Sequence, residues 1–168
     1  MLPLAGCSAV HGQTGPPPRD RPVSSLTRLV YCEWACSQAG RRGETQDRKG
    51  RGGLDSLALA QRIVDVAADR QASDILLLDL RAISPIADYF VICSGNSERQ
   101  LEAIEREIVD QLRDHEHLRP RQREGNAASG WVLLDYGDVV VHIFSASERE
   151  FYRLEELWSA APTVVRVQ

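Results

Sequence analysis

Four aspartates lie at expected strand ends or turns, where carboxylates could hold a magnesium ion for phosphoryl transfer: Asp79, Asp88, Asp135 and Asp138. Two carboxylates on one strand point to the same side when one residue separates them, because side chains alternate along a strand. Asp135 and Asp138 are three positions apart, and that spacing favours a role in a turn. A metal-dependent phosphoryl-transfer enzyme that uses Asp135, Asp138 or Asp79 remains the alternative interpretation.

Two other residues, Ser94 and His142, could each serve in a phosphate-binding or catalytic site. Ser94 precedes Gly95 at the end of an expected strand and before a helix, where backbone amides can hold a phosphate. His142 alternates with apolar residues on an expected strand, without a serine or cysteine nucleophile motif. Cys32 and Cys36 lack the second ligand pair that a zinc site needs. We therefore expect no catalytic residue, no metal and no cofactor.

Recognition is the function that these residue types favour. Trp131 follows Gly130 at the mouth of an expected strand, and exposed aromatic residues are common interface anchors. Together with Tyr136, Asp135 and Asp138 it could form a patch with an aromatic centre and an acidic rim, suited to a basic protein surface. That Trp131 is simply a core residue remains an open alternative.

A β-hairpin over residues 131–144 carries most of these candidates. Two runs of β-branched and aromatic residues flank Asp135-Tyr136-Gly137-Asp138, and Gly137 can take the positive φ of a tight turn. Three consecutive valines, 139–141, predict a strand that is covered on both faces.

The remaining elements position this hairpin. Apolar spacing predicts a helix over 56–70 and buried strands over 75–80 and 89–94. A capping box at Ser97 begins a second helix that extends to about His115, and a polar loop follows over 118–130. A second capping box, Ser147-Glu-Arg-Glu150, begins a short helix. We therefore expect a single α/β domain with a mixed central sheet of four or five strands and flanking helices.

Composition divides the chain in two. Residues 1–53 hold eight basic and four acidic residues and lack a sustained period, so we expect a disordered extension, with a short helix around 26–36 as an option. Residues 54–162 should form the domain and 163–168 a C-terminal tail.

The part from residue 54 onward carries a net charge of −8, which disfavours extensive direct nucleic-acid binding. Of the four cysteines only Cys93 falls in a strand, so a reducing compartment suits the chain.

From about Leu57 to Trp158 the chain resembles the ribosomal silencing factor family, also called the Iojap or RsfS family. The resemblance rests on stretches in consistent order: Ala72-Ser-Asp-Ile-Leu-Leu-Leu-Asp-Leu-Arg81, Ser84, Ala87-Asp-Tyr-Phe-Val-Ile92, Ser94-Gly-Asn-Ser97, Arg99-Gln100, Glu124-Gly125, the hairpin 131–144, Arg149-Glu-Phe-Tyr152 and Leu157-Trp158. It does not extend to residues 1–53.

The resemblance implies a cytoplasmic translation repressor with a nucleotidyltransferase-like fold but no enzyme activity. Such proteins bind ribosomal large-subunit protein fourteen and sterically block joining of the small subunit under nutrient limitation. By position, the implied partner-binding residues are Trp131, Asp135, Tyr136, Asp138, His142, Asp88 and Ser94. A large-subunit assembly factor is a further alternative, and a homodimer remains open.

Overall fold

The computed structural model describes residues 55–168. The elements are α2 (Ser56–Asp69), β1 (Ser73–Asp79), β2 (Tyr89–Gly95), α3 (Glu98–Glu116), β3 (Gln122–Asn126), η1 (Ala127–Ser129), β4 (Trp131–Asp135), β5 (Val139–Ser145), α4 (Ala146–Tyr152), α5 (Leu154–Leu157) and β6 (Thr163–Val167). No helix within this part of the chain is long and apolar enough to cross a membrane.

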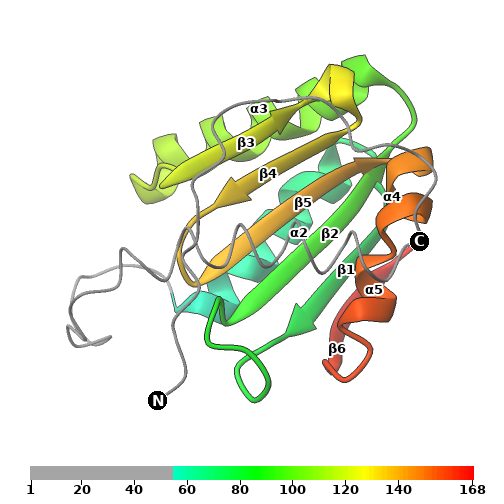
Figure 1. The fold of residues 1–168 in the computed structure, drawn as a ribbon. Helices are drawn as coiled ribbons and strands as arrows, with labels where there is room; N and C mark the ends of the chain where they lie inside the picture. The colour runs from blue at the N-terminus through cyan, green and yellow to red at the C-terminus, as the bar shows by residue number, and fades with distance from the viewer. Residues whose placement is uncertain (1–54) are drawn as a thin grey trace, which may run out of the picture.

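The strands form one mixed sheet in the order β3-β4-β5-β2-β1-β6 (Figure 1). β2 and β5 run parallel in the centre, and the other neighbouring strands are antiparallel. The predicted α/β domain with a mixed sheet is confirmed, although the sheet has six strands rather than four or five. Both central strands are buried almost throughout, as the valine run predicted.

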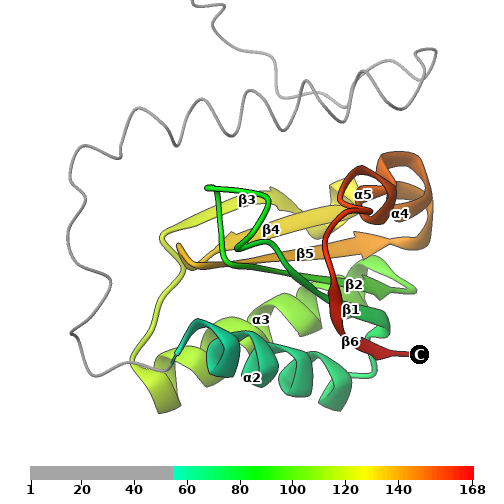
Figure 2. The ribbon, with the colours of Figure 1, turned by 90° about the horizontal axis from the view of Figure 1, so that it is seen from below.

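Two helices cover one face of the sheet, which we call the helix face. Figure 2 shows α2 and α3 side by side beneath the strands. The predicted apolar stripe of α3 is confirmed, since Leu101, Ile104, Ile108 and Leu112 are all fully buried. They pack with residues of alternate strand positions, such as Val91 and Val141, in one continuous core.

The opposite face carries the aromatic side chains, and we call it the aromatic face. α4 and α5 lie on this side of the sheet (Figure 2). Its cluster contains Phe90, Leu133, Phe144, Tyr152 and Leu154, with Trp131, Phe151 and Trp158 packed against it at partial exposure.

The expected polar loop over 118–130 is wrong for residues 122–129. β3 pairs with β4 from Gln122 opposite Asp135 to Asn126 opposite Trp131. The sequence Gln-Arg-Glu-Gly-Asn has no apolar alternation because β3 is an edge strand whose side chains are largely exposed. Pairing with β4, rather than local propensity, makes this segment a strand.

The expected C-terminal tail is also wrong, because Thr163–Val167 forms β6 and pairs antiparallel with β1. This short edge strand contains a register shift opposite Leu77 and Leu78, so it lacks a clear period of two. The expectations for residues 1–53, including the option of a helix over 26–36 and the weighing of Cys32 and Cys36, lie outside the described residues.

The second capping box was placed two residues too late. Ser145 is the N-cap of α4, and its hydroxyl accepts the Glu148 N–H at 3.3 Å, whereas Ser147 lies inside the helix. The helix is interrupted at Arg153, which has a φ of 44°, so α4 and α5 are separate. The first capping residue, Ser97, was predicted correctly and accepts the Gln100 N–H at 3.2 Å.

Candidate functional site

The predicted hairpin is confirmed, and its turn is held by Asp135. The Asp135 carboxylate accepts the Gly137 N–H at 2.6 Å, and the Tyr136 N–H donates to the Val139 carbonyl at 2.9 Å. Gly137 has a φ of 96°, in the region that favours glycine. The Asp135 side chain, 6% exposed, therefore serves the turn.

Asp135→Ala is expected to lower the free energy of unfolding by about 1–2 kcal/mol, because it leaves the Gly137 N–H without its acceptor in a part-buried place. Asp138→Ala at the exposed side of the same turn should change it by about 0.5 kcal/mol at most. Urea unfolding of both variants measures the difference. Equal losses would show that the Asp135 bond does not stabilise the turn.

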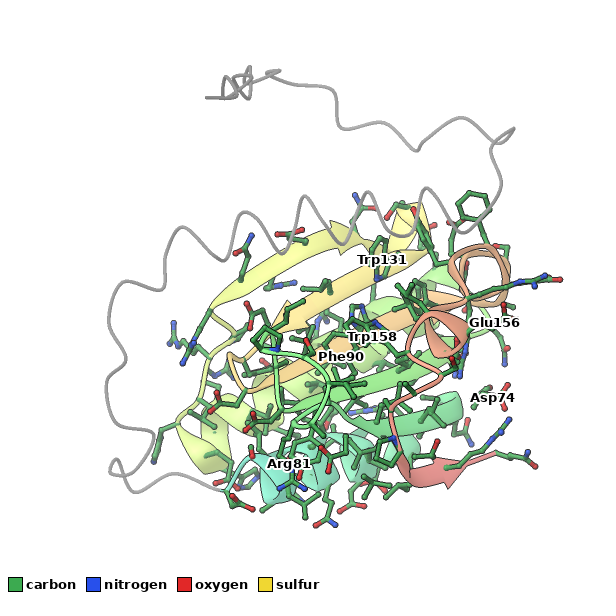
Figure 3. All side chains as sticks on the ribbon, turned by 60° about the horizontal axis from the view of Figure 1, so that its bottom comes forward. Asp74, Arg81, Phe90, Trp131, Glu156 and Trp158 are labelled. Atoms are coloured by element: carbon green, nitrogen blue, oxygen red, sulfur yellow. The ribbon has the colours of Figure 1, made fainter. Side chains whose placement is uncertain are left out.

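Trp131 begins β4 on the aromatic face and is partly exposed. Its ring is stacked on Phe144 at 5.3 Å between centroids and tilted against Tyr152 of α4 at 4.6 Å. Figure 3 shows Trp131, Phe90 and Trp158 on the same side of the sheet. Trp131 is thus a rigidly supported aromatic side chain with part of its surface free for contact, so both the core and the interface interpretations describe part of it.

His142 lies beneath Trp131 and is fully buried. Its Nδ1 accepts the Trp131 indole N–H at 3.4 Å, and Phe90 contacts its ring edge-on at 5.0 Å. Burial lowers the pKa of His142 to about 3, so the imidazole is neutral at physiological pH. His142 is therefore a hydrogen-bonded core group, and a role for it in partner binding stays a prediction.

Tyr136 does not join Trp131 in one patch. Its side chain is 8% exposed and packs in the core of the helix face, on the other side of the sheet. Burial raises the pKa of its phenol. Trp131 and Asp135 also lie at opposite ends of β4, about 13 Å apart at the usual rise per residue. The expected patch with Trp131 and Tyr136 at its centre is therefore not formed.

The structure groups Asp88 with the hairpin turn, at the opposite end of the strands from Trp131. The Asp88 and Tyr89 N–H groups both donate to the Asp138 carbonyl, at 2.8 and 3.1 Å. Asp135 ends β4 beside the same turn. Three aspartates thus gather in space although Asp88 and Asp135 are 47 positions apart in sequence. We call Asp88, Asp135 and Asp138 the acidic end.

The carboxylates considered for magnesium are not arranged as a ligand set. Asp79 is paired with Arg81, whose Nη2 lies 2.6 Å from Oδ2, and this bond lowers the pKa of the Asp79 carboxyl. Asp135 accepts the turn N–H described above. Within residues 55–168 no three His, Cys, Asp or Glu side chains are grouped so that they could hold a metal ion.

Ser94 lines a separate cavity of about 790 Å³ between the end of the sheet and α4–α5. Its hydroxyl receives a hydrogen bond from Arg149 Nη1 at 2.9 Å, and Arg149 Nε is paired with Glu155 at 2.6 Å. The walls also carry Asp74, Glu150 and Glu156 against Arg153 and Arg166. Acidic and basic groups are mixed, so the cavity lacks the excess of positive charge that a phosphate site needs.

Sequence reasoning places neither Phe144 beside Trp131 nor Phe90 beside His142. Phe144 is paired with Trp131 across β4 and β5, and Phe90 lies one strand further, opposite Val140. Alternation within each strand shows which side chains share a face. The parallel pairing of β2 with β5, which brings Phe90 against His142, has no local signal.

The fold and this surface define an α/β domain whose aromatic sheet face, with Trp131 partly exposed, is suited to recognition. Residues 54–168 match the sequence model of a family described as "Ribosomal silencing factor during starvation". The chain therefore belongs to the ribosomal silencing factor family, which is not known as an enzyme family, and it is a ribosome-associated regulator of translation.

Individual relatives agree with this assignment. The ribosomal silencing factor RsfS of Bacillus subtilis is 52% identical over 94 residues, which are 56% of this chain and 79% of that protein. A mouse protein named for mitochondrial assembly of the ribosomal large subunit is 33% identical over 102 residues, 58% of this chain and 43% of its own length. A crystal structure from Bacillus halodurans, 40% identical, superposes with a TM-score of 0.55 over 64% of this chain and 96% of that one.

Proposed function

We propose that this protein represses translation by binding the large ribosomal subunit through ribosomal large-subunit protein fourteen, so that the small subunit cannot join. The proposal includes action under nutrient limitation and a cytoplasmic location. The observation that carries it is the match of the whole described domain to the ribosomal silencing factor family. The partner, the steric mechanism and the location extend beyond that match.

The aromatic face supports a protein partner. Trp131 is partly exposed and is held by Phe144 and Tyr152, so binding would order few additional side chains. At the acidic end of the strands, Asp138 is exposed and Asp88 partly exposed. This combination suits a basic protein surface that also offers an apolar contact.

The net charge supports contact with ribosomal protein rather than with RNA. The part of the chain from residue 54 onward carries −8, so surrounding phosphates would repel it. We therefore propose that binding depends on contacts with ribosomal protein, and that their electrostatic part weakens as salt rises.

We further propose that the protein has no enzyme activity and requires no cofactor. The nucleotidyltransferase-like alternative would need Asp79, Asp135 or Asp138 as metal ligands, and the first two are engaged with Arg81 and Gly137. Thermal stabilisation by a nucleotide with Mg²⁺ would favour that alternative.

A second candidate is assembly of the large subunit, which the name of the mouse relative favours. An assembly factor would bind precursor subunits in preference to mature ones. Comparing sedimentation of the protein with both kinds of particle separates this function from silencing. A homodimer formed through the aromatic face would compete with binding to mature or precursor large subunits. Light scattering of the free protein tests whether such a dimer forms.

Binding to purified ribosomal large-subunit protein fourteen at low and high ionic strength tests the partner. We expect Asp138→Asn to weaken binding about twofold at low salt and to have no effect at high salt, because an exposed rim charge acts mainly through long-range attraction. Asp65→Asn removes the same charge from the exposed side of α2 and is the matched control. Equal effects of the two variants would contradict the proposed contact of the acidic end with the ribosomal protein, and no binding by the unmodified chain would contradict the proposed partner.

A further inference from the structure

The indole N–H is the one polar group of the Trp131 side chain, and it is bonded to His142. The indole N–H donates to His142 Nδ1 at 3.4 Å, and the two rings are 29° from parallel with centroids 6.1 Å apart. The pair is diagonal across β4 and β5, because Trp131 is opposite Phe144 and His142 is opposite Leu133. The sheet register therefore fixes the backbone positions from which the two side chains meet.

His142 cannot contact a partner in this arrangement, since none of its surface is exposed. Phe90 contacts it edge-on, and the Phe144 ring is stacked 9° from parallel at 6.0 Å. The implied partner-facing role of His142 is thus replaced by an indirect one. Only Trp131, of the two bonded residues, reaches the surface.

We propose that His142 is a positioning residue that holds the Trp131 indole with its N–H directed into the domain and its carbon surface toward the partner. This inference rests on the proposed function, in which Trp131 is the interface anchor. Accepting this bond requires a neutral imidazole with its proton on Nε2. Burial lowers the pKa of His142 and keeps the imidazole neutral.

This arrangement restricts the chemistry of the partner. An indole N–H left free at an interface must find an acceptor in the partner or remain unsatisfied at a cost. With its N–H bonded to His142, Trp131 offers only its ring face and carbon edge. The partner side chain that contacts Trp131 is therefore an aliphatic group or a cation packed over the ring. It is not a hydrogen-bond acceptor for the indole N–H.

The test uses a matched pair of variants in the full chain. His142→Leu removes the acceptor, and His142→Asn keeps a side-chain oxygen near the position of Nδ1 in a side chain of similar shape. In ¹⁵N-labelled protein the Trp131 indole resonance, assigned from Trp131→Phe, should shift and exchange faster with solvent in the leucine variant and stay close to the original in the asparagine variant. Large-subunit binding should fall about fivefold in the leucine variant alone.

Several results would overturn the proposal. An unchanged indole resonance in the leucine variant would show that the bond does not position Trp131, as would equal binding losses in both variants. If the leucine variant does not fold, ¹⁵N shifts of the His142 imidazole in the unmodified protein decide instead, and a proton on Nδ1 contradicts the bond. These measurements on the free protein do not depend on ribosomes, whereas undiminished binding by Trp131→Ala would reject the proposed interface itself.

Discussion

Trp131→Ala is expected to weaken binding to the large ribosomal subunit about 30-fold, equivalent to about 2 kcal/mol. Trp131 combines partial exposure with firm support from Phe144 and Tyr152, which is the environment of residues that contribute most to interfaces. Truncation would remove the ring that contacts the partner and would leave a depression over Phe144. Co-sedimentation of the full chain with large subunits at fixed salt measures the effect.

The control for this variant is loss of a similar apolar contact on the other side of the sheet. Leu118 is a partly buried residue that packs against the core of the helix face, so Leu118→Ala should lower stability without changing binding. Circular dichroism and thermal unfolding establish that both variants are folded. If a folded Trp131→Ala protein binds as well as the original, Trp131 is a structural residue and the interface lies elsewhere.

Gly125→Ala is expected to lower the free energy of unfolding by about 3 kcal/mol, a large effect for one methyl group. Gly125 has a φ of 74°, and a Cβ there would lie 2.1 Å from the Trp131 carbonyl oxygen. Because that obstacle is backbone, β3 must move away from β4 or the strand must bend. The same displacement would disturb the backbone of Trp131, so binding should also weaken. Urea unfolding measures the loss of stability.

Gly137→Ala provides the comparison. Gly137 also has a positive φ, 96°, but a Cβ there would meet the end of the Arg121 side chain, which can rotate away. We therefore expect only the conformational cost of about 1 kcal/mol. If both substitutions cost the same, the close approach of Gly125 to the Trp131 carbonyl is not the cause of the larger loss.

The elements that could be predicted are those with a local signal. The β4–β5 hairpin follows from Asp135 and Gly137 between two apolar runs, and α3 follows from Ser97 and a stripe at helical spacing. In both cases the residues that define the element also contact one another, so a short window of sequence contains the cause.

The elements that could not be predicted depend on distant partners. β3 and β6 are edge strands that exist because β4 and β1 offer unpaired backbone groups, and their own sequences have no clean alternation. The N-cap of α4 was misplaced because Ser145 and Ser147 are both acceptable caps, and the end of β5 decides between them.

The candidate site was predicted in part. Residue type and position predict Trp131 at the start of a strand and Asp135 at a turn, and both placements are confirmed. Their part in binding stays a prediction, and Tyr136 lies on the helix face rather than beside Trp131. Tyr136 continues the alternation that places Val132 and Leu134 on the helix face, whereas Trp131 and Leu133 lie on the aromatic face. The odd separation of Trp131 and Tyr136 in sequence therefore already indicates opposite faces. The contact of Phe90 with His142 arises from the pairing of β2 with β5, and the contact of Tyr152 with Trp131 arises from the position of α4. Both are tertiary features.

The most direct test of the central claim adds the full-length protein to separated ribosomal subunits and follows joined particles by sucrose-gradient sedimentation. We expect joining to fall as the protein is added, with the protein travelling with the large subunit and Trp131→Ala having much less effect. Undiminished joining while the protein travels with the large subunit would contradict the steric mechanism, and protein remaining at the top of the gradient would contradict ribosome binding.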